Sequence, residues 1–223
     1  MSYRGALSSD IPALLRSLPP KPPSSNPSGD PLASACAASS HSNTCVVYDK
    51  DALLSTFSAA KTAFGPNFTH ALAAKGCPLR FVLSLASASG LGVECASWGE
   101  CVGALKAGCE PARVVFDSPA KTREEIEWAL QEGVTLNADN LAELERIDSL
   151  QKSRATPSES VVGLRVNPIV SGGSIEMFAV SKPTSKFGHP LHTGGSRAEA
   201  VDAFAKYPWL SCIMAHVGSA GTS

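Results

Sequence analysis

Residues 91–147 read LGVECASWGECVGALKAGCEPARVVFDSPAKTREEIEWALQEGVTLNADNLAELERI, and they repeat one pattern three times. In each repeat a short apolar run is followed by an amphipathic helical stretch. An oxygen-bearing residue stands three positions before a glutamate at each junction, as in a helix capping box or a close relative of it; the pairs are Ser97 with Glu100, Thr122 with Glu125, and Asn140 with Glu143. Gly108 and Gly133 then follow two of the helical stretches, where a left-handed residue is expected. These units predict parallel strands joined by helical crossovers.

The same alternation continues on both sides of this stretch. The strands that we predict are residues 68–75, 91–97, 112–118, 133–139, 161–168 and 210–219, with helical stretches at 77–89, 98–108, 123–133 and 140–152. The first four strands begin about every 22 residues, which is the length of one strand and one helix with their turns. Because parallel strands need such long crossovers, we predict an α/β fold.

Polar residues gather at the C-terminal ends of these strands. They are Lys75, Glu94, Asp117, Asn137, Asp139, Arg165, Asn167, His216 and Ser219. Parallel α/β chains form either an eight-stranded TIM-type barrel or an open doubly wound sheet, and chemistry at the C-terminal strand ends is typical of the barrel. No G-x-G-x-x-G motif follows the first strand. We therefore predict a (β/α)8 barrel, truncated after about six strands because Ser223 comes directly after the sixth.

Residues 1–44 differ in composition from the rest of the chain. Seven of the 16 prolines lie in the first 31 residues, and this serine-rich and alanine-rich tract shows neither a helical nor a strand period. We predict a flexible leader over residues 1–44 and a barrel domain over residues 45–223. The leader has few basic residues and two acidic ones, Asp10 and Asp30, so it matches an organelle transit peptide poorly. We expect a cytoplasmic protein, with a plastid as the alternative.

Composition narrows the class of partner. The 19 basic and 20 acidic residues nearly cancel, so we predict neither a nucleic acid nor a membrane partner. No apolar run approaches the roughly 18 residues of a membrane-spanning helix, and the start MSYRGALSSD lacks the pattern of a secretory signal. The seven cysteines include no C-x-x-C pair, so we predict free thiols and no metal site. A small molecule is the partner that remains.

Six segments resemble, in the same order, those of the fold-type III pyridoxal-phosphate decarboxylases. That family includes diaminopimelate, ornithine and carboxynorspermidine decarboxylases. The segments are HALAAKG (70–76), LGVECASWGECVGALKAG (91–108), RVVFDSPAKTREEIEWALQEGVTLNADNLAELERI (113–147), VGLRVNP (162–168), SKFG (185–188) and HVGS (216–219). The resemblance runs from about Val46 to Ser219 and implies a barrel that binds pyridoxal 5′-phosphate.

The resemblance implies a role for five residues. Lys75 matches the lysine that bonds covalently to pyridoxal phosphate, although the family usually reads Ala-Val-Lys-Ala-Asn where this chain has Ala-Ala-Lys-Gly-Cys. Glu94 and Arg165 match members of a polar network around the cofactor, and we expect these two side chains to pair at the barrel mouth. His216 matches a histidine whose ring packs on the cofactor ring, and Ser219 matches a serine that binds its phosphate.

The resemblance also implies an activity, which is the pyridoxal-phosphate-dependent decarboxylation of an amino acid. Diaminopimelate is the favoured substrate, and ornithine or another basic amino acid is the alternative substrate. The alternative function is that of a catalytically silent relative that binds partner subunits, as antizyme inhibitors do.

The family's Gly-rich phosphate loop and C-terminal β domain come after the segment that ends at Ser219. We therefore expect these 223 residues alone to be inactive and the full-length enzyme to be a homodimer. We interpret Ser185–Gly188 as a lid or rim element and Ser171–Ser174 as an insertion.

Limited proteolysis tests the predicted division of the chain. We expect a protease to remove residues 1–44 and to leave a resistant body, because the leader cannot bury enough apolar surface to offset the entropy of ordering it. Mass spectrometry of the fragments locates the cuts. Early cleavage between residues 68 and 168 would contradict the division.

Overall fold

The computed structural model describes residues 48–170, 181, 183, 185–191 and 195–216. The chain divides into two units, Met1–Asp49 and Lys50–Ser223, and all of the described helices and strands belong to the second unit. The predicted leader lies outside the described residues, so it stays a prediction.

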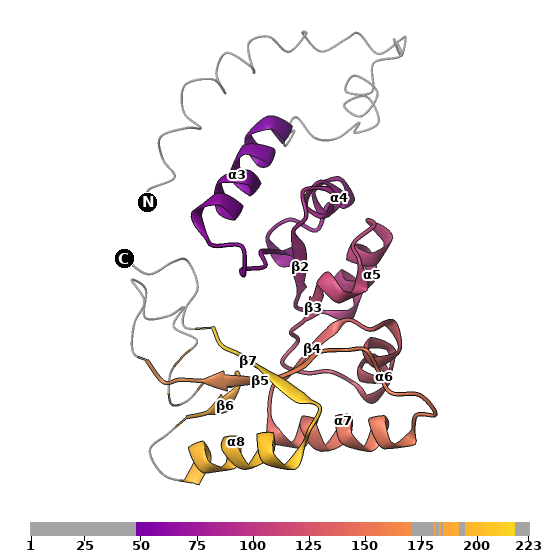
Figure 1. The fold of residues 1–223 in the computed structure, drawn as a ribbon, viewed down its shortest axis with the longest axis vertical. Coiled ribbons are helices and arrows are strands. Elements are labelled where there is room, and N and C mark those ends of the chain that lie inside the picture. Colours follow the sequence, from indigo (N-terminus) through magenta and orange to yellow (C-terminus); the bar gives the residue numbers. More distant parts are fainter. Residues whose placement is uncertain (1–47, 171–180, 182, 184, 192–194, 217–223) are drawn as a thin grey trace, which may run out of the picture. The chain divides into compact units, whose positions relative to one another are not determined.

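The second unit alternates helices and strands along the chain (Figure 1). The strands are β1 (Ala71–Ala73), β2 (Gly92–Cys95), β3 (Val114–Phe116), β4 (Thr135–Ala138), β5 (Val162–Asn167), β6 (His189–Pro190) and β7 (Leu210–Met214). The helices are α3 (Lys50–Ala63), α4 (Arg80–Ala88), α5 (Trp98–Lys106), α6 (Arg123–Glu132), α7 (Leu141–Ser153) and α8 (Gly195–Lys206), with short 3₁₀ turns η1 (Ala74–Gly76) and η2 (Pro111–Arg113). None of the helices in the described part of the chain is both long enough and apolar enough to cross a membrane.

The strands form one parallel sheet. Neighbours follow the order β1-β2-β3-β4-β5, and β7 pairs in parallel with β5, beside which it lies in Figure 1. These six strands are the six that the sequence predicts, so the α/β class and the parallel sheet are confirmed. The two-residue strand β6 pairs with the C-terminal end of β5 and was not predicted, because two residues carry no period.

The predicted helix starts are confirmed at all three junctions. The side chains of Ser97, Thr122 and Asn140 each accept a hydrogen bond from the backbone N–H three residues later. Thr122 and Glu125 complete a reciprocal capping box. The glutamates of the other two junctions, Glu100 and Glu143, instead accept from the residue before the cap, Ala96 N at 2.7 Å and Asp139 N at 2.9 Å. Gly133 ends α6 at φ 77°, as expected for a left-handed C-terminal residue.

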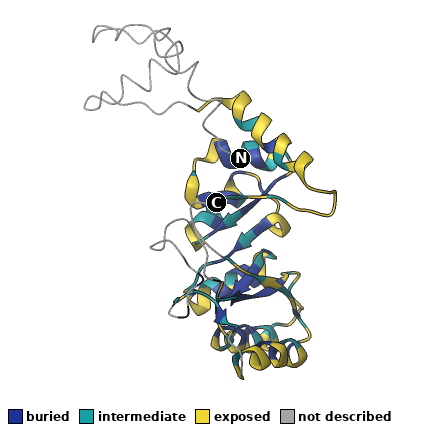
Figure 2. Cartoon of the chain, turned by 90° about the vertical axis from the view of Figure 1, so that its left-hand side faces the viewer, coloured by how far each residue is buried: buried dark blue, intermediate teal, exposed yellow. Residues whose placement is uncertain are grey.

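The core lies between the sheet and its helices. Helices α4 and α5 pack on β2, α6 and α7 pack on β4, and α8 packs on β6 and β7. All six residues of β5 are buried, which is typical of a parallel strand covered on both faces. Figure 2 shows the same division, with buried strands and helices whose outer faces are exposed. The five described cysteines are free thiols, as predicted.

Gly163 permits a close approach inside the sheet. The pairing of β5 with β7 shifts register between Val162 and Gly163. A Cβ at position 163 would overlap the Asn137 side-chain oxygen and would press against the Cys212 side chain. A larger residue would therefore have to displace the Asn137 side chain and push against Cys212 of β7, and glycine avoids both contacts.

A buried ion pair joins the ends of two strands to a helix. Lys121 Nζ lies 3.0 Å from Glu143 Oε1, and both side chains are fully buried. Lys121 Nζ also donates to the carbonyl oxygen of Asn137 at 2.7 Å, and Asp139 N donates to Glu143 Oε2. The pair therefore ties the loop after β3 to the end of β4 and the start of α7.

Removing one member of this pair should be costly. We expect Lys121→Met to destabilise the fold by about 3–5 kcal/mol, because it leaves the Glu143 carboxylate buried without a cation. Adding Glu143→Gln should recover part of the loss, because the amide oxygen still accepts from Asp139 N. Urea unfolding followed by circular dichroism gives these free energies.

Lys152→Met is the matched control. Lys152 pairs with Asp148 at 2.6 Å on the surface with its side chain 76% exposed, so its loss should change stability by less than about 1 kcal/mol. Equal effects of the two lysine substitutions would contradict the role assigned to Lys121.

Candidate active site

Polar side chains in or just after six strands meet at the C-terminal edge of the sheet. Lys75, in η1, directly follows β1, Glu94 lies in β2, Asp117 and Asp139 directly follow β3 and β4, Arg165 lies in β5, and His216 follows β7. Because parallel strands end at one edge, residues far apart in sequence become neighbours there. Ser219 and Ser171–Ser174 lie outside the described residues, so their predicted roles have no structural description.

Lys75, just after β1, and Glu94, in the adjacent strand β2, form a loose pair. Strand pairing places Ala73 opposite Glu94, and the Lys75 Nζ lies 4.0 Å from Glu94 Oε2. The Lys75 side chain is 57% exposed, whereas that of Glu94 is 16% exposed. A pair with one exposed member at this distance adds little stability. Because the Lys75 side chain is exposed and only weakly paired, its amine is accessible to a ligand. Lys75 itself lies in a 3₁₀ turn and not in the strand that we predicted over residues 68–75.

Burial raises the pKa of the Glu94 carboxyl above its ordinary value. Lys75 and His216 partly offset this rise by attraction, while Asp117 and Glu100 add to it by repulsion. Desolvation is the largest of these causes, and the carboxyl therefore holds a proton more readily than an exposed glutamate does.

Arg165 is buried between two carboxylates. Its Nη1 lies 3.5 Å from Asp117 Oδ2 and 3.7 Å from Asp139 Oδ1, and its guanidinium stacks 4.6 Å from the centre of the Phe187 ring. Gly188 N also donates to Asp139 Oδ1, at 3.1 Å. Burial raises the pKa of Asp139, and the Gly188 N–H and Arg165 oppose that rise. The Ser185–Gly188 segment thus contacts the site through a ring and a backbone N–H.

The predicted pairing of Arg165 with Glu94 is wrong. Among the described residues, the ion pairs of Arg165 are those with Asp117 and Asp139, and Glu94 pairs with Lys75. The physical reason is strand order: β3 and β4 both lie between β2 and β5. Carboxylates on those nearer strands therefore reach the guanidinium first.

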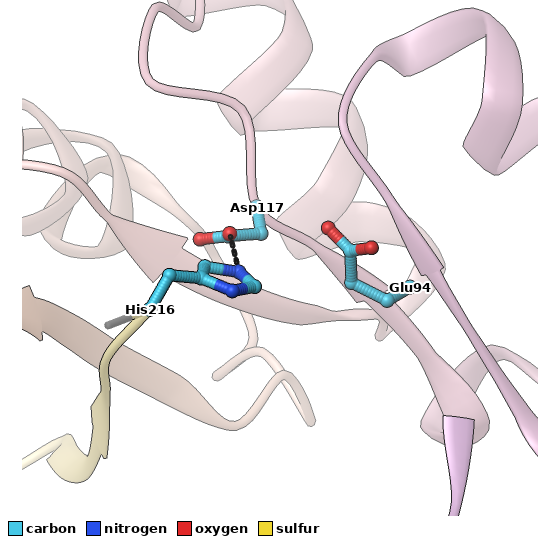
Figure 3. Close-up of side chains that lie close together, drawn as sticks. All are labelled: Glu94, Asp117 and His216. Carbon is cyan, nitrogen blue, oxygen red and sulfur yellow. Dashed lines mark ion pairs between the residues drawn. The ribbon is translucent and has the colours of Figure 1, made fainter. Parts of the chain in front are cut away.

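His216 contacts Asp117 (Figure 3). The imidazole Nε2 lies 3.3 Å from Asp117 Oδ2, and this contact is an ion pair when the ring is protonated. The Asp117 side chain is 3% exposed, and that of His216 is 36% exposed. Asp117 Oδ1 is buried and has no hydrogen-bond partner in the described part of the chain.

Sequence reasoning placed Asp117 and Asp139 at strand ends but assigned them no role. The signal for both was present, because each acid directly follows an apolar strand. Phe187 belongs to the SKFG segment, but nothing in the sequence indicates that its ring stacks on Arg165.

Spacing alone would allow a metal ion at this edge. Ligand atoms of Glu94, Asp117 and His216 all lie within 4.8 Å of one another. Two of these three groups, however, already face a cation, Lys75 in one case and Arg165 in the other. A divalent ion would be repelled by both cations, so this mixture of charges is better suited to an organic ligand.

The second unit of the chain matches a known family. The family model described as pyridoxal-dependent decarboxylase, pyridoxal binding domain, covers residues 50–223. The chain is 33% identical over 152 residues to a diaminopimelate decarboxylase of Zymomonas mobilis, which covers 67% of this chain and 35% of that protein. It is 30% identical over 188 residues to the diaminopimelate decarboxylase of Staphylococcus aureus, covering 82% of this chain and 43% of that protein. The chain thus spans less than half of the length of either relative.

Solved structures agree with the sequence relatives. The diaminopimelate decarboxylase of Helicobacter pylori, complexed with L-lysine, has a TM-score of 0.71 at 27% identity and covers 83% of this chain and 47% of that chain. The Paramecium bursaria Chlorella virus arginine decarboxylase bound to agmatine has a TM-score of 0.58 at 19% identity, covering 77% of this chain and 44% of that chain, which supports the fold alone. Together with the six parallel strands, these matches confirm the predicted pyridoxal-phosphate-binding α/β barrel fold.

The raised pKa of Glu94 predicts how stability depends on pH. Because the folded carboxyl holds its proton more tightly than the unfolded one, its contribution to stability is present at low pH and is lost as the pH rises through the folded pKa. Glu94→Gln removes this loss. We therefore expect the variant to gain stability relative to the parent apoprotein as the pH rises from the ordinary glutamate pKa, about 4, toward neutrality, measured by thermal unfolding.

Glu127→Gln provides the control for this prediction. Glu127 is exposed on α6, and its substitution removes the same charge. An equal pH-dependent gain in both variants would show that net charge, and not the burial of Glu94, is the cause.

Proposed function

Because this chain belongs to the pyridoxal-dependent decarboxylase family, we propose that it forms the cofactor-binding barrel of an amino-acid decarboxylase. The observation that carries the proposal is the accessible amine of Lys75 at the C-terminal edge of the sheet, with the Glu94 carboxyl 4.0 Å away. In α/β barrels this edge holds the reacting groups.

The described residues fit the aldehyde and the ring of pyridoxal phosphate. An aldehyde needs an accessible primary amine, and the half-exposed Lys75 provides one. A flat aromatic ring needs a flat partner, and the partly exposed imidazole of His216 provides one at the same edge. We propose that Ser219 binds the phosphate, as the resemblance implies.

Pyridoxal phosphate, when bound, supplies an electron sink for the electrons that remain on the α carbon after carbon dioxide leaves. Lys75 would hold the cofactor through its Nζ. Glu94 would accept or return a proton at that nitrogen, and its raised pKa makes it a better proton acceptor than an ordinary carboxylate. The buried Arg165 would balance the negative charge of Asp117 and Asp139 beside the cofactor.

We propose diaminopimelate as the substrate of a protein that contains this chain. The relatives at 30% and 33% identity are diaminopimelate decarboxylases, and the Helicobacter pylori enzyme was solved with L-lysine. Ornithine or another basic amino acid is the alternative substrate, and a silent binding relative is the alternative function. A homodimer and a cytoplasmic or plastid location stay predictions.

Reductive labelling tests the role of Lys75. After incubation with pyridoxal phosphate and reduction with borohydride, peptide mapping should find the pyridoxyl group on Lys75. Lys75→Ala should abolish the label, whereas Lys186→Ala, which changes the lysine of the SKFG segment, should retain it. A label on another lysine of the unsubstituted protein would overturn the assignment.

Carbon dioxide release tests the activity. A protein containing this chain should release carbon dioxide from diaminopimelate at a rate that exceeds the rates with ornithine, lysine and arginine. Lys75→Ala should lower the rate by at least about 10³-fold, since covalent catalysis loses its nucleophile. A higher rate with ornithine would replace diaminopimelate as the proposed substrate. If none of the four amino acids released carbon dioxide, the decarboxylase proposal would be wrong and the silent binding relative would be the favoured function.

A further inference from the structure

Asp117 contacts both a cation and the imidazole at this edge of the sheet. Its Oδ2 lies 3.5 Å from Arg165 Nη1 and 3.3 Å from His216 Nε2. We propose that Asp117 is a positioning residue that fixes the His216 ring, and through it the cofactor ring, relative to Lys75. The effect on the cofactor rests on the proposed function, whereas the effect on His216 does not.

Asp117 is itself held rigidly. It follows β3 directly, its backbone N–H donates to the Cys95 carbonyl oxygen at 2.8 Å, and its side chain is 3% exposed. The carboxylate therefore has little freedom to follow a moving partner. A rigid support of this kind is what positions a functional side chain.

The two partners of Asp117 do not depend on it equally. Without Asp117, Arg165 would keep Asp139 at 3.7 Å and the stacked ring of Phe187. In the part of the chain that the structure describes, His216 has its ion pair with Asp117 alone. Loss of the Asp117 charge should therefore release His216 and leave Arg165 in place.

The Asp117 carboxylate also carries a cost in folding stability. Its Oδ1 is buried and has no hydrogen-bond partner among the described residues, and an unsatisfied buried oxygen costs free energy. Arg165 also keeps Asp139 as a counter-charge at 3.7 Å, so the fold does not rely on the Asp117 charge alone. We therefore expect Asp117→Asn, which keeps the shape, to leave stability unchanged or higher while it weakens cofactor binding, as in a trade-off between stability and function.

The experiment uses Asp117→Asn with Asp139→Asn as the matched control, because both remove a buried carboxylate beside Arg165. Spectroscopic titration with pyridoxal phosphate should show about tenfold weaker binding for Asp117→Asn, in the range of coupling between contacting groups. In a double-mutant cycle, Asp117→Asn should add almost nothing to His216→Asn. Additive losses of affinity would overturn the proposal, since Asp117 would then act independently of His216.

A second readout does not need the cofactor. In the apoprotein, the proton NMR signals of the His216 ring, assigned by their absence in His216→Asn, should move in Asp117→Asn and stay in place in Asp139→Asn. Unchanged signals in Asp117→Asn would overturn the proposal even if cofactor binding were weaker. If the parent protein bound no pyridoxal phosphate, the proposed function would fail and these signals would still decide the role of Asp117.

A failure to fold would also be informative. If Asp117→Asn does not fold, Asp117→Ser, which is smaller and uncharged, replaces it in the NMR comparison. If neither variant folds while Asp139→Asn does, Asp117 serves the fold and the proposal is overturned.

Discussion

The buried ion pair of Lys121 with Glu143 fixes the edge of the sheet on which the site depends. It holds the loop after β3 against the end of β4 and the start of α7, with no part of either side chain exposed. A single buried charge in that position would lower the free energy of unfolding, so removing either residue alone should destabilise the fold. Asp117 and Asp139 lie within four residues of members of this pair, and their placement depends on the same loop and helix start.

The parallel sheet brings together, at one edge, the ends of strands that recur along the sequence. Strands β1–β5 and β7 have three to six residues each. Because they are parallel neighbours in one sheet, their C-terminal ends lie side by side at one edge. Three carboxylates then face one buried guanidinium, one exposed ammonium and one imidazole. Burial raises the pKa of Glu94 and Asp139, and the cations limit the rise. The result is a set of acids whose charge depends on neighbours from other strands.

Much of the fold could be predicted because its signals are local. The cap residues Ser97, Thr122 and Asn140 lie three positions from their glutamates, and the backbone N–H groups that they satisfy are equally close. The missed elements lacked such signals: β6 has two residues, and α3 and α8 had neither a predicted cap nor a place in the regular repeat. Lys75 was expected at a strand end and lies in a 3₁₀ turn, a change of one or two residues that an apolar run cannot specify.

The sequence by itself determined the alternation of strands and helices, the positions of the polar strand ends and the family resemblance, because each is encoded in neighbouring residues. Only the tertiary structure decided which of those polar groups pair. Arg165 pairs with Asp117 and Asp139 and not with Glu94, and Asp117 contacts both Arg165 and His216. These choices follow from strand order and from short distances between residues as far apart in the sequence as Asp117 and His216. Coulomb attraction and desolvation depend on such distances and on burial, which spacing along the chain does not contain.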